Sequence, residues 1–391
     1  MIKPFGRRFG SSAVIAVAII AATTSRADAQ QNAYVVTRLV SDIAALSGKV
    51  IDPVLQNAWG VAFSPAGSPF WIADNATGCS TLYNGDGTKV TLQVSIPLPG
   101  GSVPPTACKT VNPNSPPNPT PAAPTGIIWN PSSAFVVPGS VSPANPKGIQ
   151  AAFIFDTEDG TISAWAGGLN PADNAVLAVD NSASGAVYKG LAYGVNVNGF
   201  FLFATNFRAR TIDVFGAPST PGGLFTTATT AGGFIDPDIP PHFAPFGIQN
   251  INGNLFVTYA KQNAAMHDDA AGPGRGFVDV FDTDGHLLSR FASRGTLNSP
   301  WGVARASFAF GDFSDDILIG NFGDGLINVF NSHGRFIDQL NKPNGKPLKI
   351  DGLWTLTLGG GAKSGSETLY FTAGPNMEMD GLFGTITPVS K

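Results

Sequence analysis

The sequence has little charge and few of the side chains that most often perform catalysis. Only 13% of its 391 residues are charged, the net charge is −4, and there are four histidines and two cysteines. No basic stripe is present, which argues against nucleic acid as a partner. The Gly-x-Ser-x-Gly elbow, the His-Glu-x-x-His motif and the phosphate-binding glycine loop are all missing, so a Ser or Cys triad hydrolase is not indicated.

Long apolar runs are scarce, and the one near the start has the form of an export signal. Lys3, Arg7 and Arg8 precede an apolar stretch at 12–22 that is too short to span a bilayer as an ordinary helix. Small residues at 27–29 form a cleavage site. We expect a signal peptide at 1–29, with general secretion and the twin-arginine route both open.

The remaining chain, 30–391, contains no second apolar run of membrane length. We therefore expect no stable membrane insertion after cleavage, and an exported protein that is either periplasmic or secreted. Cys79 and Cys108 form a plausible disulfide in an oxidising compartment, and two unpaired thiols are the alternative. Two cysteines without a Cys-x-x-Cys pair do not make a zinc site.

What the sequence does have is glycine, proline and phenylalanine, at 47, 31 and 28 residues. This composition is typical of many short strands joined by tight turns, with aromatic packing between sheets. No convincing long amphipathic helix follows the signal. The chain is therefore expected to be all-β.

One short phrase, of the type aromatic-Gly-Val-Ala, returns six times. Its copies lie at 57–63, 124–129, 188–193, 244–249, 299–304 and, most loosely, 351–356. The glycines at 60, 126, 190, 247, 302 and 352 are 50 to 66 residues apart. Each copy is followed by two or three further strand-like segments, so the repeats predict a six-bladed β-propeller of four-stranded blades.

The last repeat lacks a fourth strand, and the segment 34–40 is strand-like but belongs to no repeat. We predict that this N-terminal strand closes the ring by pairing with the strand at 384–387. Residues 30–391 then form a single propeller domain, from which 100–124 and 261–276 project as long loops.

Polar residues at strand ends are expected to gather at one mouth of the central channel. The candidates are Asp74, Asn75, Asn206, Lys261, Asn321, Asp351 and Asn376. Stacking surface would come from Trp59, Phe246, Trp301 and Trp354. Carboxylate and amide oxygens suit Ca²⁺, with Asn206, Asn321 and Asp351 as ligands. The alternative is purely structural: Asp and Asn at strand ends cap turns, and aromatic residues wedge blades together.

The run His267, Asp268 and Asp269 in the long loop is the densest candidate for metal binding or acid–base work. The alternative is a solvated loop with an ion pair to Arg275.

The repeat at 300–330 resembles the NHL-type propellers. More closely, the chain resembles an uncharacterised family of secreted bacterial NHL-like proteins, through blocks at 259–262, 267–281, 320–325, 350–354 and 369–376. The resemblance covers about 34–387 and implies the fold and export, but no activity. Gluconolactonase-type propellers, which hold calcium with channel Glu, Asn and Asp, offer a weaker likeness, because no channel Glu can be matched. Amidating lyases place histidines before the first-strand glycine, where this chain has none.

Two functions remain. The first is an exported propeller that binds a protein, a glycan or a small ligand on one face or at the channel mouth, without catalysis. The alternative is a calcium-dependent lactonase- or lyase-like enzyme that uses the channel. The sequence leaves open whether the protein is an enzyme.

Overall fold

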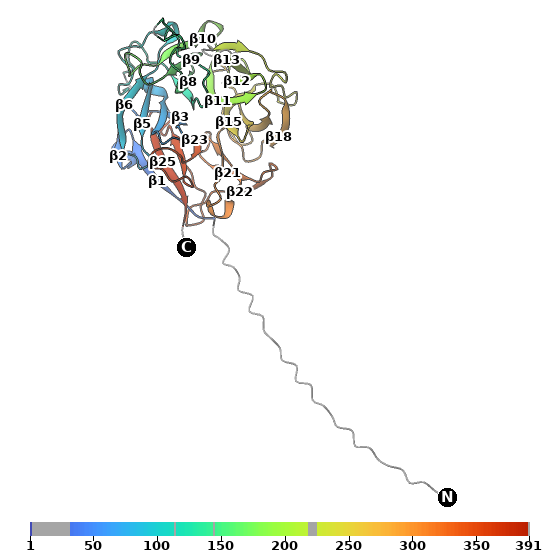
Figure 1. Cartoon of the computed structure of the whole chain (residues 1–391). Coiled ribbons are helices and arrows are strands. Elements are labelled where there is room, and N and C mark those ends of the chain that lie inside the picture. The colour runs from blue at the N-terminus through green and yellow to red at the C-terminus, as the bar shows by residue number, and fades with distance from the viewer. Residues whose placement is uncertain (2–31, 113–114, 144, 218–224, 390–391) are drawn as a thin grey trace. The chain divides into compact units, whose positions relative to one another are not determined.

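Short apolar strands punctuated by glycine turns fold here into six antiparallel sheets arranged as the blades of a propeller (Figure 1). The computed structural model describes Met1 and residues 32–112, 115–143, 145–217 and 225–389. Apart from Met1, the predicted signal at 1–29 lies outside the described residues. No helix in the described part of the chain has the length and apolar character needed to cross a membrane.

Five blades each consist of four strands that are consecutive in the chain, from the channel outward. The first two blades are β3 (Ala58–Ala62), β4 (Phe70–Asp74), β5 (Cys79–Tyr83) and β6 (Lys89–Ser95), then β7 (Pro124–Trp129), β8 (Phe153–Thr157), β9 (Thr161–Trp165) and β10 (Val176–Asp180). The third and fourth are β11 (Tyr188–Asn196), β12 (Gly199–Asn206), β13 (Thr211–Ala217) and β14 (Thr226–Ala228), then β15 (Phe243–Ile251), β16 (Asn254–Lys261), β17 (Gly276–Phe281) and β18 (Leu287–Ser293). The fifth is β19 (Pro300–Arg305), β20 (Ile317–Asn321), β21 (Ile327–Phe330) and β22 (Phe336–Gln339).

The sixth blade is built from both ends of the described chain. It contains β23 (Leu353–Leu358), β24 (Leu369–Ala373) and β25 (Leu382–Pro388), followed by β1 (Tyr34–Ser41) and the short parallel strand β2 (Val50–Ile51). β1 pairs antiparallel with β25, with Val36 opposite Ile386. The predicted ring closure by the N-terminal strand is confirmed. Among the described residues, helical structure is limited to 3-10 turns at η1 (Ala44–Leu46), η2 (Asn75–Thr77), η3 (Pro99–Gly101), η4 (Ser182–Ser184) and η5 (Gly311–Phe313).

Five of the six inner strands carry a bulge at the glycine of the repeated phrase. In the second blade the register shifts between Pro124 and Ile127, so that Gly126 faces the next inner strand. A Cβ on Gly126 would lie 2.3 Å from the backbone nitrogen of Leu191. Glycine at position 126 therefore allows these two inner strands to lie this close to each other.

The sixth copy of the phrase was aligned three residues too early. The equivalent bulge in the last blade falls between Leu353 and Leu356, which puts Thr355 at the glycine position. Gly352 instead lies in a turn before β23, with φ of 63°. Thr355 fits because its hydroxyl donates a 2.8 Å hydrogen bond to the carbonyl of Trp59 and so closes the inner ring.

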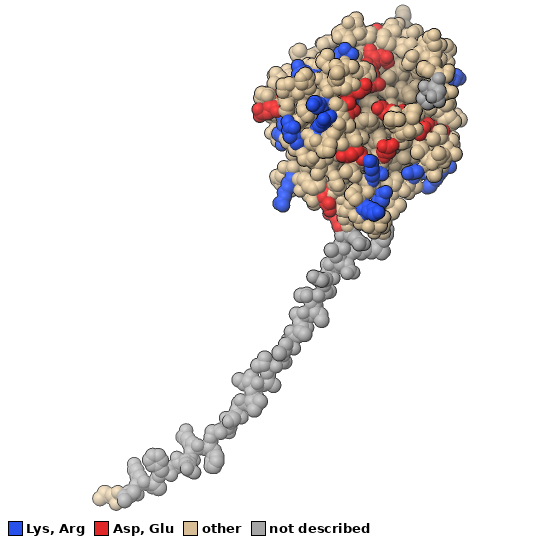
Figure 2. Space-filling model, turned by 180° about the vertical axis from the view of Figure 1, so that it is seen from behind, with Lys and Arg blue, Asp and Glu red and all other residues tan. Residues whose placement is uncertain are grey.

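The hydrophobic core is divided among the gaps between neighbouring blades. Each gap holds its own cluster, for example Leu318, Val329, Leu353 and Phe371 between the last two blades. This is how a propeller buries a large apolar area without a single centre. Outside, Figure 2 shows a surface that is mostly uncharged on the face in view, with several acidic side chains near its middle.

Candidate functional site

The channel is closed near one mouth by aromatic side chains from the inner strands and the strand ends beside them. We call this group the axial plug: Trp59, Phe207, Phe246, Trp301, Phe322 and Trp354. Trp59 stacks on Trp354 with ring centroids 3.4 Å apart, and Phe322 stacks on the same indole at 3.9 Å. Trp59 and Trp354 are both 1% exposed. The four aromatic residues proposed as a stacking surface for ligands therefore pack against one another, as one stacked pair with edge-to-face contacts around it.

The ammonium group of Lys189 lies on the axial plug. Its Nζ is 5.2 Å from the ring centroid of Trp59 and 5.9 Å from that of Phe207. Nζ donates to the carboxylate of Glu158 and, at 3.3 Å, to Asp268, while only 2% of the side chain is exposed. A charge buried this deeply requires such partners.

The electrostatics of Lys189 are set by opposing effects. Burial alone lowers the pKa of its ammonium group, but the carboxylates of Glu158 and Asp268 outweigh this effect and the pKa is raised. Lys189 is therefore charged at neutral pH. Its backbone carbonyl also accepts a 2.8 Å bond from the indole N–H of Trp301, which fixes the strand against the plug.

A chain of side-chain hydrogen bonds runs from Glu158 across the mouth. Asn75 donates to Glu158 at 2.9 Å, and Asn57 donates to Asn75 at 3.1 Å and to Glu378 at 2.8 Å. Burial raises the pKa of Glu378 to about 7; the bond from Asn57 opposes the rise and the charge of Glu158 adds to it. Glu378 therefore changes its charge near neutral pH.

The loop between β16 and β17 brings His267 and Asp268 to the same place. His267 Nδ1 lies 2.8 Å from Asp268 Oδ1. This bond raises the pKa of His267 and holds the pKa of Asp268 well below its usual range, where Lys189 acts in the same direction. Asp269 turns away and accepts from the hydroxyl of Ser299, and burial raises its pKa.

The expected ion pair between this run and Arg275 does not form. The guanidinium of Arg275 donates instead to the carbonyls of Ala270 and Ala271, both at 3.0 Å. The loop is held by backbone bonds, including that from Asn263 N to Asp268 O at 2.8 Å. The basic partners of Asp268 are therefore Lys189, 79 residues earlier, and its neighbour His267, and not Arg275.

We call the resulting set the mouth cluster: Asn57, Asn75, Glu158, Lys189, His267, Asp268 and Glu378. Ligand atoms of Glu158, His267 and Asp268 lie within 4.8 Å of one another, a donor set that suits a divalent cation. Lys189 bonds to two of the three. A metal ion would therefore have to compete with a buried ammonium for Glu158 and Asp268.

The other residues predicted at this site lie elsewhere or have structural contacts. Asn206 accepts from the backbone of Val187 and donates to Asp213. Asn321 accepts from the backbone of Asn298 and donates to Asp324. These bonds support turns at strand ends, and neither amide bonds to the mouth cluster in the described part of the chain.

Lys261 ends β16 and is half-buried, with its backbone carbonyl accepting from Ala270 N at 2.6 Å. Asp351 is exposed and accepts from the backbone of Asn376 at 3.0 Å. Both Asp351 and Asn376 line a groove beside β1. The proposed calcium ligands Asn206, Asn321 and Asp351 thus each bond to residues of separate turns, and no bond joins any two of the three among the described residues.

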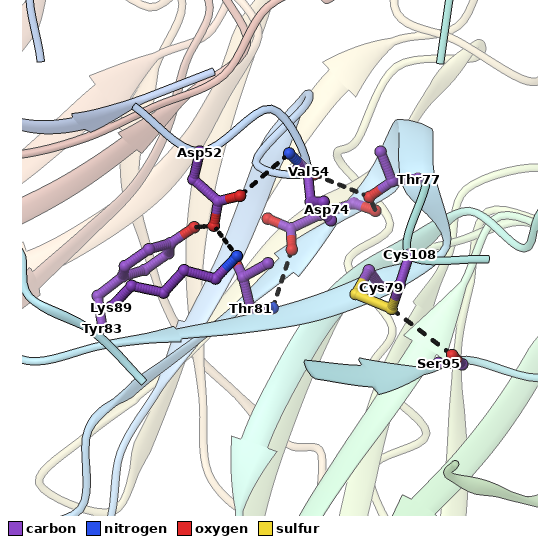
Figure 3. Close-up of a disulfide and its surroundings, with 10 residues drawn as sticks. All are labelled: Asp52, Val54, Asp74, Thr77, Cys79, Thr81, Tyr83, Lys89, Ser95 and Cys108. Atoms are coloured by element: carbon purple, nitrogen blue, oxygen red, sulfur yellow. Dashed lines mark hydrogen bonds and ion pairs between the residues drawn. A yellow bond between two sulfur atoms is a disulfide. The ribbon is translucent and has the colours of Figure 1, made fainter. Parts of the chain in front are cut away.

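Asp74 is fully buried inside the first blade, beside the disulfide that joins Cys79 to Cys108 (Figure 3). One carboxyl oxygen accepts from the backbone of Thr81 at 2.9 Å, and the other has no partner among the described residues. Burial raises the pKa of Asp74 well above its usual range. This carboxyl is therefore a buried group inside the first blade and not part of the mouth.

Glu158 and Glu378 were missed by the sequence reasoning, although Glu158 left a signal. β4 ends opposite Ala58 at Asp74, and β8 ends opposite Pro124 at Thr157, so Glu158 is the counterpart of Asn75 one blade later. Glu378 left none. It lies in a turn where Asn376, Met377 and Glu378 all have positive φ, a conformation that sequence patterns do not reveal.

Comparison with known proteins gives relatives without a described activity. No family model matches the chain. The chain is 35% identical to uncharacterized protein R640 of Acanthamoeba polyphaga mimivirus over 243 residues, which are 61% of this chain and 43% of that protein. These relatives are viral, so they lend no support to the expected bacterial, secreted NHL-like family.

Solved structures that resemble the fold include a catalytically inactive virginiamycin B lyase from Staphylococcus aureus, at 12% identity and a TM-score of 0.42 over 85% of this chain and 80% of that one. Regucalcin from Agrobacterium tumefaciens, a calcium-binding protein, matches at 10% identity and a TM-score of 0.41 over 87% and 93%. Such distant likenesses carry no argument about function.

Two further mimivirus proteins match over most of their length. Uncharacterized protein R648 is 30% identical over 86% of this chain and 76% of its own, and uncharacterized protein L690 is 30% identical over 86% and 81%. The chain belongs to the protein family that includes R648 and L690.

Proposed function

We propose that this propeller binds a small polar ligand at the mouth of its channel. The observation that carries the proposal is the mouth cluster, in which charged side chains from different blades converge on Lys189 above a channel closed by aromatic rings. Convergent polar groups with shifted pKa values are a common feature of ligand sites.

The exposure of these groups indicates which ligand they suit. Lys189 is 2% exposed and already paired, whereas Asp268 is 59% exposed and Glu378 is half-buried. The groups offered to solvent are therefore mainly carboxylates, with His267 beside them. A ligand that carries an amine or several hydroxyl groups fits this surface, because it can donate hydrogen bonds to carboxylates.

The test is a calorimetric screen of small amines, amino sugars and neutral sugars against the protein, repeated with Asp268→Asn. A ligand of the mouth loses about tenfold in affinity in this variant, since one charge-assisted hydrogen bond contributes on the order of 1.5–3 kcal/mol. Asp173→Asn, an exposed carboxylate elsewhere, is the matched control. Equal loss in both variants, or no ligand in any class, would contradict the proposal.

A second candidate is a metal-dependent lactonase- or lyase-like enzyme. The closeness of Glu158, His267 and Asp268 favours it. Under this proposal Lys189→Met raises the affinity for Ca²⁺ or Zn²⁺, because it removes the competing ammonium, and Glu158→Gln lowers it. Elemental analysis of the purified protein and titration of both variants decide the matter: no change in metal affinity in either variant excludes this function.

We also propose that the protein is exported through its first 29 residues. The disulfide between Cys79 and Cys108 supports this, because such bonds persist in oxidising compartments. Mass spectrometry of the protein from its host should give an N-terminus near residue 30. An uncleaved protein in the cytoplasm would exclude export.

A further inference from the structure

A groove lies beside β1, the strand that closes the ring. None of the residues that line it belongs to the mouth cluster. The groove has a volume of about 850 Å³ and is formed by β1, by the connection from β22 to β23 and by the turn after β24. Apolar side chains such as Ile350 and Leu382 line part of it. This volume is in the range of sites for sugar- or drug-sized ligands.

Three cations line this groove: Arg38 on β1, and Lys342 and Lys349 on the connection. None of them forms an ion pair with another described residue, although nine such pairs are found in that part of the chain. Arg38 is partly oriented, because its Nη1 donates to the carbonyl of Leu46 at 2.7 Å. The remaining guanidinium donors and both ammonium groups are not engaged by carboxylates.

The groove contains one carboxylate, Asp351, which accepts the backbone N–H of Asn376 at 3.0 Å. With three cations against this single acid, the lining has a positive charge within a protein whose net charge is −4. A groove with an excess of positive charge attracts anions, even when the protein as a whole is negatively charged. Arginine and lysine together provide both a planar fork and point charges for oxyanions.

We propose that this groove binds a sugar-sized molecule that carries two or more phosphate or sulfate groups. The three cations neutralise the oxyanions, and the half-buried side chains of Val36 and Leu46 contact the carbon skeleton. Because β1 and the β22–β23 connection both contribute cations, the ligand bridges the closing strand and the neighbouring blade. Binding therefore stabilises the closed ring.

The test uses titration calorimetry at low ionic strength with two probes, inorganic tripolyphosphate and a disulfated disaccharide. The expected result is saturable binding of at least one probe, weakened about tenfold by the double variant Lys342→Ala/Lys349→Ala and by high salt. The probe that binds more tightly separates phosphate from sulfate chemistry. The melting temperature should rise with the bound probe in the wild-type protein.

Lys109→Ala/Lys147→Ala is the charge-matched control, since both of its lysines are exposed and outside the groove. All four lysines are on the surface, so both double variants should fold, which circular dichroism checks. Equal weakening by both double variants would show only non-specific attraction and overturn the proposal. Failure of both probes to bind the wild-type protein would overturn it as well.

Discussion

The pairing of Lys189 with Glu158 gives a sharp test of the mouth cluster. Glu158→Gln removes the main partner of an ammonium that is 2% exposed and leaves it only Asp268, which is 59% exposed and 3.3 Å away. Loss of one partner from a buried pair costs on the order of 3–5 kcal/mol. The rings of Trp59 and Phe207 still face the ammonium, so we expect a loss of roughly 3 kcal/mol in the free energy of unfolding.

Adding Lys189→Met to this variant should restore most of the loss. Methionine keeps the apolar stem packed against the axial plug and removes the unpaired charge. Because neutral replacement of a whole buried pair is often nearly neutral for stability, the double variant should be more stable than Glu158→Gln alone by about 2 kcal/mol. This sign is unusual, since most second mutations destabilise further.

Urea unfolding followed by tryptophan fluorescence and circular dichroism measures the free energy of unfolding of the wild-type protein, Glu158→Gln and the double variant. Glu367→Gln provides an exposed control. The stability that Glu158→Gln loses relative to the wild-type protein should become smaller as the pH rises toward the ordinary lysine pKa of about 10.4. Without Glu158 the buried ammonium loses its proton more readily than in the unfolded chain, so stability rises with pH. A double variant as unstable as Glu158→Gln would refute this account of Lys189.

Three other perturbations address the mouth, the ring closure and the disulfide. Glu378 has a pKa of about 7 in the folded protein and an ordinary value of 4.5, so the stability of the wild-type protein falls as the pH rises from about 4.5 to about 7. Glu378→Gln should abolish this decline. Its free energy of unfolding should exceed that of the wild-type protein by roughly 2–3 kcal/mol at about pH 8 but not at about pH 5. Urea titrations at both values measure it, and parallel pH profiles of the two proteins would contradict it. Deletion of 30–42 removes β1, whose Tyr34, Leu39 and Val40 are at most 3% exposed, so calorimetry should show no cooperative melting; a native-like transition would disprove the closure role. Cys79→Ala/Cys108→Ala removes a crosslink between residues 29 apart and should lower the free energy of unfolding in urea by about 3 kcal/mol. A reductant should lower the stability of the wild-type protein but not that of the double variant. An equal effect of the reductant on both proteins would count against this role of the disulfide.

The fold could be predicted from the sequence because each blade repeats the same phrase, and because 34–40 was a strand without a repeat. The glycine position of the last copy was predicted three residues too early, at Gly352. The bulge of this blade instead has Thr355 at that position. Thr355 succeeds through its hydroxyl contact with Trp59, a tertiary feature that local pattern does not encode.

The site was predicted less well, because it depends on loops rather than on repeats. Asn75 and the run from His267 to Asp269 were identified, but the partner of Asp268 is Lys189, in another blade. Asn206 and Asn321 are the counterparts of Asp74, one residue before the Asn75 position, and they bond within their own turns. Glu378 reaches the mouth from a left-handed turn at 376–378, which a local sequence pattern does not reveal.

The pairing of β1 with β25 has a consequence for synthesis. The strand that closes the ring leaves the ribosome first among the strands, and its partner, about 350 residues later, leaves last. At about 5–20 residues per second, β1 waits tens of seconds with its backbone groups unpaired. During translation the nascent chain therefore carries an open β edge at its front and another on each newest blade, and such edges recruit other chains.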